Sequence, residues 1–318
     1  MKKFKVFIDG SEGTTGLRIN ERFLDRDDIE VMKIDSELRK DPVERARLIN
    51  ASDYTFLCLP DAAAIEAVTL IDKNNDHTVI IDASTAHRTN PEWAYGLPEL
   101  SSDFENAIKT SRRIANPGCY ASGFIMMAYP LVKGDILAED YPMCISAVSG
   151  YSGAGKKAIA LYEDENKRED LFSPRQYALT QQHKHLKEMK AIVGLSQDPI
   201  FIPTVDDYYC GMIVNLPIHA NLMKKKMSVD EIRSYLADYY AGKQFIRVCT
   251  KDDEEGLGGF IHANKLAGKD YAEIYVTGND DRMTVSAVFD NLGKGASGAA
   301  VECLNISMGV DAAKGLVL

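Results

Sequence analysis

The sequence predicts an α/β domain built on a parallel sheet, followed by an α+β domain with a mixed sheet. Three observations support this fold class. Apolar strands alternate with helical stretches over the first third of the chain, a break at Asn116-Pro117-Gly118 precedes a new apolar helix, and strands dominate from residue 200 to residue 290. We therefore expect one domain over residues 1–118 and a second over 119–290, with a helix over 291–318 returning to the first.

The elements of the first domain follow from changes in hydrophobic period and from turn residues. The strands are fully apolar, which is typical of a parallel sheet covered by helices on both faces. Asp61 is a candidate N-cap for the third helix. The predicted strands are Lys5–Asp9, Glu30–Ile34, Tyr54–Leu59 and Thr78–Asp82, and the predicted helices are Gly16–Leu24, Pro42–Asn50 and Ala62–Lys73.

A glycine-rich loop follows the first strand and opens the first helix. Its glycines permit a tight turn and a close approach of pyrophosphate to the backbone, while the helix N-terminus attracts the phosphate charge. The spacing differs from the common GxGxxG pattern, and a plain strand–helix turn is the alternative. The position in the first βα unit favours a Rossmann-type dinucleotide site whose loop residues are Gly10, Ser11, Gly13, Thr14, Thr15 and Gly16.

The end of the second strand carries mixed signals about the type of dinucleotide. Asp35 would favour the free 2′-hydroxyl of NAD. Ser36, Arg39 and Lys40 would favour the 2′-phosphate of NADP, although two cations in a solvated loop are also ordinary. The residues alone leave both cofactors open.

Cys119 is the candidate nucleophile. It follows Asn116-Pro117-Gly118 and precedes an apolar stretch from Tyr120 to Leu131, so we expect it at or just before the first turn of a helix. The free backbone N–H groups there favour a thiolate, which is the form that attacks a carbonyl carbon. The other five cysteines lie in apolar settings and are expected to act as small core residues.

The second domain mixes helices with later strands. Ser228 is the expected N-cap of the helix that interrupts these strands. The predicted helices are Gly155–Glu163, His183–Ile192 and Val229–Tyr240, and the predicted strands are Met143–Val148, Ile200–Ile202, Gly211–Ile218, Phe245–Cys249, Tyr271–Val276 and Met283–Phe289.

Three further groups are candidates for acid–base chemistry or anion binding. His183 and His185 are two residues apart, so on a helix they would point in different directions, and a plain surface pair is the alternative. Arg88 follows a strand's carboxyl end, where ligands bind in open α/β sheets. The turn from Ser149 and Gly150 to Lys157 resembles an anion cradle but lacks the P-loop order.

Composition excludes several classes of protein. The net charge of −10 argues against a general nucleic-acid or membrane-surface role. No run approaches 18 apolar residues, and the N-terminus reads as a strand rather than as a signal peptide. Six scattered cysteines without a CxxC pair, and no metal-ligand spacing, favour free thiols in a cytoplasmic protein that needs no metal.

Taken together, these motifs resemble those of N-acetyl-γ-glutamyl-phosphate reductases of the short form, which are relatives of aspartate-semialdehyde dehydrogenase. The resemblance covers essentially the whole chain, and its most specific part is Pro117-Gly-Cys-Tyr120. The other matching segments are Gly10–Gly16, Leu59-Pro60-Asp61, Asp82–Arg88, Gly96–Leu100, Val148–Gly155, His183–His185, Gly211-Met212 and Asp290–Gly298.

The resemblance implies a glyceraldehyde-3-phosphate dehydrogenase-like fold and a role in arginine biosynthesis. It implies NADPH-dependent reduction of N-acetyl-L-glutamyl 5-phosphate to the 5-semialdehyde and phosphate, through a Cys119 thioester with His183 as acid–base residue. It also implies homodimers or homotetramers. The cofactor site would include Pro60 and Asn291, and the candidate substrate ligands are Arg88, Arg113, Asn116, Ser149, Gly150 and His185.

One departure from the family pattern concerns the substrate carboxylate. Longer members commonly carry Arg-Gly where this chain has Gly211-Met212, so that ligand is not transferred. Two alternative functions stay open. A related reductase would act on aspartyl or aminoadipyl phosphate, and a non-catalytic NADP-binding sensor would use the first domain without Cys119.

Overall fold

The computed structural model describes residues 3–318 and divides into two compact units. The first unit comprises the chain up to Gly118 together with Ala296–Val317, and the second comprises Cys119–Gly295 with Leu318. The predicted fold class is confirmed, because the first unit holds a parallel sheet between helices and the second holds a mixed sheet.

The sheet of the first unit has the strand order β2-β1-β3-β4-β6-β5, and its described strand pairs are all parallel. The carboxyl ends of its strands therefore share one edge, where ligands bind in such sheets. The central strands β1 and β3 are almost wholly buried, as their apolar sequences predict. The strands are β1 Phe4–Asp9, β2 Ile29–Met32, β3 Tyr54–Leu57, β4 Val79–Asp82, β5 Ala94–Tyr95 and β6 Arg113–Ala115.

Helices complete the first unit, and two predictions about them need correction. Asp61 does not cap α3, because Pro60 is the N-cap and the Asp61 carboxylate accepts hydrogen bonds from the N–H and hydroxyl of Thr85. The last helix, α10, occupies only Gly298–Met308 of the predicted 291–318 and packs its small residues into the core of this unit. The remaining helices are α1 Thr14–Phe23, α2 Pro42–Ala51, α3 Asp61–Thr69, α4 Ser102–Thr110 and the 3₁₀ turn Pro98–Leu100.

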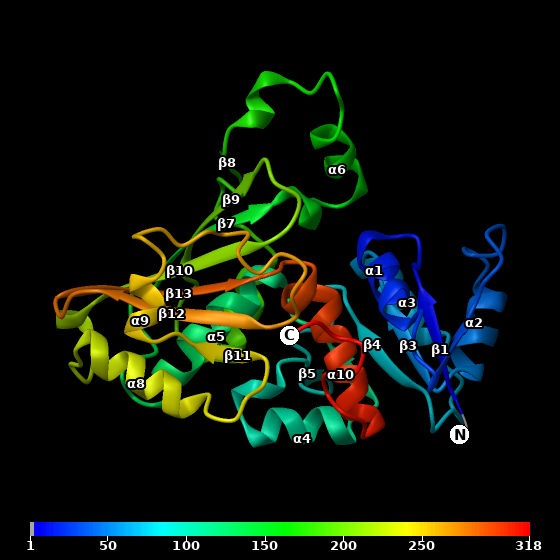
Figure 1. The fold of residues 1–318 in the computed structure, drawn as a ribbon. Helices are drawn as coiled ribbons and strands as arrows, with labels where there is room; N and C mark the ends of the chain where they lie inside the picture. Colours follow the sequence, from blue (N-terminus) through cyan, green and yellow to red (C-terminus); the bar gives the residue numbers. More distant parts are fainter. Residues whose placement is uncertain (1–2) are drawn as a thin grey trace. The chain divides into compact units, whose positions relative to one another are not determined.

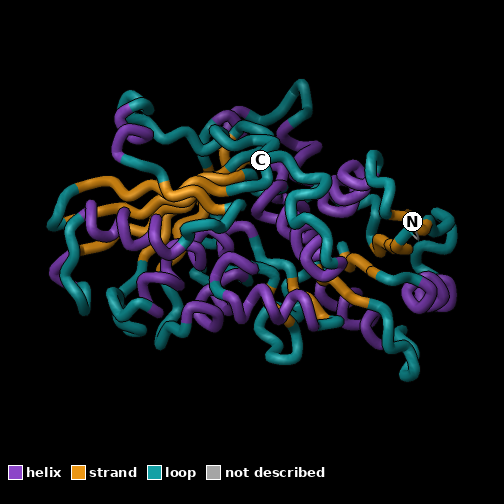
Figure 2. Tube along the Cα trace, turned by 60° about the horizontal axis from the view of Figure 1, so that its bottom comes forward, coloured by secondary structure: helices purple, strands orange, loops and turns teal. Residues whose placement is uncertain are grey.

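The sheet of the second unit has the order β11-β12-β13-β10-β7-β9-β8 and mixes parallel with antiparallel pairs (Figure 2). Antiparallel pairing of β10, β12 and β13 forms its centre. The strands are β7 Cys144–Gly150, β8 Arg175–Gln176, β9 Ile200–Asp206, β10 Met212–His219, β11 Ile246–Val248, β12 Ala272–Gly278 and β13 Arg282–Phe289.

Helix α5, Cys119–Lys133, is buried along most of its length and packs against β10 and β13. Gly123 permits this approach, because a Cβ there would lie 2.6 Å from Cγ2 of Val214. The excursion between β7 and β8 carries α6 and extends from the sheet (Figure 1). The other helices are α6 Lys156–Tyr162, α7 His185–Val193, α8 Val229–Tyr239 and α9 Lys251–Glu255, with 3₁₀ turns Tyr151–Ala154, Glu169–Phe172 and Ala220–Leu222 and a π-helical turn Gly293–Ser297.

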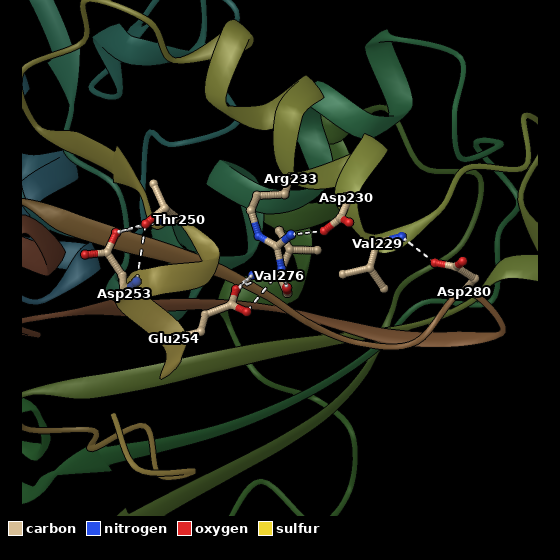
Figure 3. Close-up of polar contacts among 8 residues, drawn as sticks. All are labelled: Val229, Asp230, Arg233, Thr250, Asp253, Glu254, Val276 and Asp280. Carbon is tan, nitrogen blue, oxygen red and sulfur yellow. Dashed lines mark hydrogen bonds and ion pairs between the residues drawn. The ribbon is translucent and has the colours of Figure 1, made fainter. Parts of the chain in front are cut away.

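Side chains close the edge of β12 beyond the short strand β11. Arg233 of α8 donates to the Val276 carbonyl at 2.7 Å and to the Glu254 carboxylate at 3.1 Å (Figure 3). The Glu254 carboxylate in turn accepts the Val276 N–H at 3.3 Å. Both backbone groups of an otherwise unpaired edge residue are thereby satisfied, which removes a template for strand addition.

Two findings correct or complete the sequence-based description. The predicted helix over 183–192 begins at His185, so His183 precedes the helix rather than lying on it. Within residues 3–318, no helix is long and apolar enough to cross a membrane.

Candidate active site

The glycine loop of the first unit has the geometry of a phosphate-binding turn. Gly10 has φ +89°, and a Cβ at this position would lie 2.3 Å from the Cys58 carbonyl oxygen. A Cβ at Gly16 would lie 2.5 Å from the Gly10 carbonyl oxygen. Helix α1 begins at Thr14, directly after the loop, so its first N–H groups point toward the loop. The close approaches explain why this loop requires glycine.

A cavity of about 330 Å³ lies beside this loop. Ser36, Arg39 and Lys40 line it, and so does Pro60 from the end of the neighbouring strand. The Asp35 carboxylate instead accepts the N–H of Glu37 at 2.9 Å in a local turn. The residues present therefore fit a dinucleotide, with the loop for its pyrophosphate and cations near its ribose.

Glu12 and Arg39 form an ion pair at this cavity, and both residues line it. Their side chains are 60% and 50% exposed, so the pair is open to solvent. The pair places a carboxylate against a guanidinium that could otherwise meet a ligand phosphate. Glu12 could not be predicted as a site residue from the sequence, because a charged residue in a loop carries no distinctive pattern.

Three hydrogen bonds hold Asn116 at the carboxyl edge of the parallel sheet. Its N–H donates to the Asp82 carbonyl at 2.8 Å, its carbonyl accepts from Nε of Arg88 at 2.8 Å, and its Nδ2 donates to the Ala296 carbonyl at 3.0 Å. Among the described residues, no group bonds to the buried Oδ1 atom of Asn116. A buried acceptor of this kind is suited to receive a ligand N–H.

The two candidate arginines occupy different places. Arg88 is buried and also donates to the Ala83 carbonyl at 3.2 Å, while the neighbouring His87 stacks on Trp93 with ring centroids 4.0 Å apart. Arg113 is the first residue of β6, at the opposite end of the strand from Asn116, and burial lowers its guanidinium pKa. Arg88 thus lies nearer the ligand-binding edge of the sheet than Arg113 does.

Cys119 is the first residue of α5, as the sequence predicts. The preceding Pro117 and Gly118 carry no side-chain acceptor for the first N–H groups of the helix, whose positive dipole end lies at this turn. The backbone of Gly295 comes close to it, because a Cβ on Gly295 would lie 2.9 Å from the Cys119 Cβ. The glycine-rich segment after β13 therefore adjoins the candidate nucleophile.

Two tyrosines link Cys119 to the rest of the second unit. Tyr177 and Ser149 are among the groups that influence the pKa of the Tyr120 hydroxyl. Burial is the main cause that raises the pKa of Tyr120 and Tyr177, and the charge of the nearby Cys119 thiolate raises both further. Both phenols therefore stay protonated and serve as hydrogen-bond donors at neutral pH.

His183 lies among these same aromatic rings. Its ring centroid is 6.1 Å from that of Tyr120, 5.9 Å from Tyr177 and 5.1 Å from Phe201. His185 is buried, and its ring centroid is 4.6 Å from that of His183. Cys119 and His183 thus share Tyr120 and Tyr177 as neighbours, although they lie far apart in the sequence.

Asn291 and Gly150 are held by close contacts within the second unit. The Asn291 side chain accepts the Gly211 N–H at 2.9 Å and donates to the Ser152 hydroxyl at 2.9 Å. A Cβ on Gly150 would lie 2.6 Å from two backbone carbonyl oxygens, those of Tyr208 and Tyr209. These contacts fix the end of β7, where Ser149 meets Tyr120.

The remaining thiols are set apart from Cys119 by their surroundings. Loss of solvent raises the pKa of Cys58 to about 12 and that of Cys249 to about 11, and it also raises the pKa of Cys144. Cys303 is fully buried and donates to the Gly96 carbonyl. None of the six cysteines, all of which lie within residues 3–318, forms a disulfide. Within residues 3–318, no group of three or more His, Cys, Asp or Glu side chains could hold a metal ion.

Family models match both parts of the chain. Residues 5–109 match the semialdehyde dehydrogenase NAD-binding domain, and residues 119–291 match the semialdehyde dehydrogenase dimerisation domain. The N-acetyl-gamma-glutamyl-phosphate reductase 2 of Nostoc sp. is 42% identical over 99% of this chain and 100% of its own length. The N-acetyl-gamma-glutamyl-phosphate reductase of Brucella anthropi is 42% identical over 96% of this chain and 99% of its own length.

The chain belongs to the N-acetyl-gamma-glutamyl-phosphate reductase family. Solved structures agree on the fold. Aspartate semialdehyde dehydrogenase II of Vibrio cholerae, in complex with ASA, has a TM-score of 0.70 at 15% identity over 97% of this chain and 99% of its own. The aspartate semialdehyde dehydrogenase of Francisella tularensis has a TM-score of 0.71 at 16% identity over 95% and 99%.

Membership of the N-acetyl-gamma-glutamyl-phosphate reductase family fixes the type of cofactor and the type of second unit. The cofactor is a nicotinamide dinucleotide, and the second unit carries the dimerisation domain of the semialdehyde dehydrogenases. Tyr120 and Tyr177 were missed as site residues by the sequence analysis. Tyr177 lies in a polar connecting segment, and no spacing in the sequence indicates that it meets Tyr120.

Proposed function

We propose that this chain reduces N-acetyl-L-glutamyl 5-phosphate to N-acetyl-L-glutamate 5-semialdehyde and phosphate, with NADPH as the hydride donor. The observation that carries the proposal is the position of Cys119. It heads a long buried helix and shares two tyrosine neighbours with His183. A thiol so placed is suited to attack an activated acyl group, and a histidine that shares its tyrosine neighbours is suited to assist at the carbonyl oxygen.

Cys119 acts as the nucleophile in this mechanism. Its thiolate attacks the acyl carbon, the carbon–oxygen bond to phosphate breaks, and a thioester remains on the enzyme. When bound, NADPH would supply the hydride that brings the thioester carbon to the aldehyde level. Collapse of the resulting adduct releases the semialdehyde and restores the thiolate. The first N–H groups of α5 and His183 stabilise the oxygen on which negative charge develops.

NADP is the proposed form of the cofactor. Ser36, Arg39 and Lys40 line the cavity beside the glycine loop, whereas the Asp35 carboxylate is engaged by the Glu37 N–H. Two cations favour a 2′-phosphate over a free hydroxyl. Gly10, Gly13 and Gly16 would hold the pyrophosphate with Ser11, Thr14 and Thr15, and Asn291 would contribute to the nicotinamide side.

The proposed substrate ligands are matched to the acetamido group and the anionic oxygens of the substrate. Asn116 offers a buried carbonyl oxygen for a ligand N–H, and the acetamido group of the substrate has one. Arg88, at the same edge of the sheet, is the better-placed of the two arginines for an anionic oxygen. Ser149, Gly150 and His185 would line the acyl chain, and Arg113 is the weaker candidate.

We also propose a homodimer or homotetramer that works in the cytoplasm. The second unit corresponds to a dimerisation domain. Six free thiols agree with a reducing compartment. The small-molecule partners would be the acyl phosphate and inorganic phosphate.

The test is phosphate-dependent oxidation of N-acetylglutamate semialdehyde with NADP, which is the reverse reaction. The wild-type chain should oxidise this aldehyde in preference to aspartate semialdehyde, and with NADP in preference to NAD. Cys119→Ser should reduce kcat by at least about 1,000-fold while the Kd for NADPH stays unchanged. Near-normal turnover in this variant excludes the nucleophile role, and a wild-type preference for aspartate semialdehyde reassigns the substrate.

A further inference from the structure

One arginine of the second unit lies on the same face of the sheet as the groups beside Cys119. Arg175 is the first residue of β8 and pairs with Val205 of β9, and Val205 pairs in turn with Ser149 of β7. Residues that pair across neighbouring strands have their side chains on one face. Arg175 therefore shares a row of the sheet with Ser149, which is buried.

Tyr177 continues this face two residues further along the chain. Its N–H donates to the Pro203 carbonyl at 3.0 Å, so the pairing with β9 continues past the end of β8. In an extended chain, side chains two residues apart lie on one face, about 7 Å apart. The Tyr177 ring centroid is 6.4 Å from that of Tyr120, the residue after Cys119. Arg175 is therefore one step along the sheet from the tyrosines that adjoin the candidate nucleophile.

An aromatic pair holds the Arg175 guanidinium in place. Nε and Nη2 of Arg175 donate to the Tyr162 hydroxyl at 3.3 and 2.9 Å, and Cζ lies 5.3 Å from the Tyr162 ring centroid. The Tyr162 side chain is buried and stacks on the Tyr151 ring with centroids 4.6 Å apart. Both tyrosines belong to the excursion that carries α6 (Figure 1). The guanidinium is thus oriented by groups of its own unit.

The carboxylate that faces Arg175 is shared with a second arginine. Oδ2 of Asp170 lies 3.5 Å from Nη1 of Arg175 and accepts from Nη2 of Arg168 at 2.8 Å. The Arg168 side chain is 75% exposed, whereas that of Arg175 is 35% exposed. Lys167, another cation of the excursion, donates to both carboxylate oxygens of Asp207 at 2.7 Å. Arg175 therefore combines shelter from solvent with an Nη1 group that can bind a further anion.

The proposed substrate carries an anionic group at a matching distance. Four carbon–carbon bonds of about 1.5 Å separate its reacting carbon from the carbon of its α-carboxylate, which is a reach of about 5 Å when extended. Arg175 and Tyr177 are separated by about 7 Å along the strand. With the reacting carbon at Cys119, the α-carboxylate is therefore within reach of the long Arg175 side chain.

We propose that Arg175 binds the α-carboxylate of the substrate and thereby selects an aldehyde derived from an amino acid. The inference rests on the proposed function and adds to it a residue that contacts the substrate. A planar guanidinium can bind a carboxylate through two N–H groups, which fixes the direction of the carboxylate as well as its distance. The bonds to Tyr162 restrict the guanidinium before the substrate arrives, which lowers the entropic cost of binding.

The test compares N-acetylglutamate semialdehyde with 4-acetamidobutanal, which lacks only the α-carboxylate. In the phosphate-dependent oxidation, Arg175→Ala should lower kcat/KM for the first aldehyde by about 10- to 150-fold, mainly through KM, which is the range for hydrogen bonds to a charged group. It should change kcat/KM for the second aldehyde by less than about 2-fold. Arg175→Lys keeps the cation but not the fork, so its preference should fall between those of the wild type and Arg175→Ala, and it provides a second test if the alanine variant folds poorly.

Arg168→Ala is the matched control, because it removes the other guanidinium beside Asp170 and should leave both aldehydes unaffected. Equal losses on the two aldehydes in Arg175→Ala would indicate a merely structural role and overturn the proposal. An unchanged preference for the carboxylate in that variant overturns it too.

A second readout does not depend on turnover. N-acetyl-L-norvaline, in which a methyl group replaces the aldehyde, should protect Cys119 from iodoacetamide. Half-protection should require about 10- to 150-fold more of this compound in Arg175→Ala than in the wild type. Equal half-protecting concentrations, or no protection of the wild type, overturn the proposal. A wild type that is protected but oxidises no N-acetylglutamate semialdehyde contradicts the proposed function alone, so the two failures are distinguishable.

Discussion

Alkylation of the chain by iodoacetamide at pH 7.5 should modify Cys119 ahead of the other thiols. The surroundings of the other thiols set the expected difference in alkylation rate. With pKa values of about 11 and 12, Cys249 and Cys58 are thiolate in about one molecule in 3,000 and one in 30,000. An ordinary thiol, with a pKa of about 8.5, is thiolate in about one molecule in ten. The two should therefore react about 300-fold and 3,000-fold more slowly than an ordinary exposed thiol.

The assay follows each cysteine by peptide mass spectrometry after timed quenching. Cys119 should be modified first and in step with loss of activity, and acyl phosphate should protect it. Cys119→Ser is the control, because the slow alkylation that remains in this variant comes from the other five thiols. Cys210, half-buried on the loop before β10, is a further competitor and should not be protected by substrate. The reasoning is refuted if Cys249 or Cys58 reacts as fast as Cys119.

Two further substitutions test contacts away from the reacting thiol. Glu12→Gln removes the carboxylate that pairs with Arg39. It should tighten NADPH binding by about 1.5- to 5-fold, the range expected for an exposed ion pair, and leave NADH binding unchanged. Equal effects on the two Kd values in fluorescence titrations would contradict this expectation. Arg233→Ala leaves the Val276 carbonyl and the Glu254 carboxylate without their donor (Figure 3). Arg233→Ala should lower the free energy of unfolding by about 2–3 kcal/mol in urea titrations. Glu12→Gln is the control and should change the free energy of unfolding by less than about 0.5 kcal/mol.

The parts of the fold that could be predicted from the sequence are those set by local chemistry. The break at Asn116-Pro117-Gly118 places Cys119 at the start of a helix, because proline and glycine end the strand and the apolar run that follows has no other N-terminus. The glycine loop was predictable for the same reason. Its residues lie next to one another, and a Cβ on Gly16 would meet the Gly10 carbonyl within the loop, although the close approach of Gly10 to the Cys58 carbonyl could not be predicted in this way.

His183 shows why the parts of the site that depend on long-range packing could not be predicted from the sequence. A periodic pattern cannot distinguish the first residue of a helix from a residue that caps it, so the predicted helix began two residues early. The rings that enclose His183 come from α5, β9 and the segment after β8, and no spacing in the sequence brings these together. The sequence alone therefore does not distinguish His183 from a surface histidine.

Cys119 directly follows the first unit in the chain. The first unit ends at Gly118, and the thiol is on the first residue of the second. Asn116, two residues before that boundary, is bonded to β4, to the loop after β4 and to the segment that begins at Ala296. The backbone leading to the nucleophile is therefore fixed on the cofactor-binding unit, while its helix is fixed on the other.

This arrangement gives Arg88 a function that does not depend on touching substrate. Its Nε bond to the Asn116 carbonyl holds the residue from which the Pro117-Gly118 turn departs. Proline at the next position restricts the conformation of Asn116, so a displaced Asn116 carries the turn and the start of α5 with it. Loss of Arg88 should therefore disturb the placement of the thiol itself, and a fall in kcat on its replacement would reflect that displacement as much as any lost contact with an anionic oxygen.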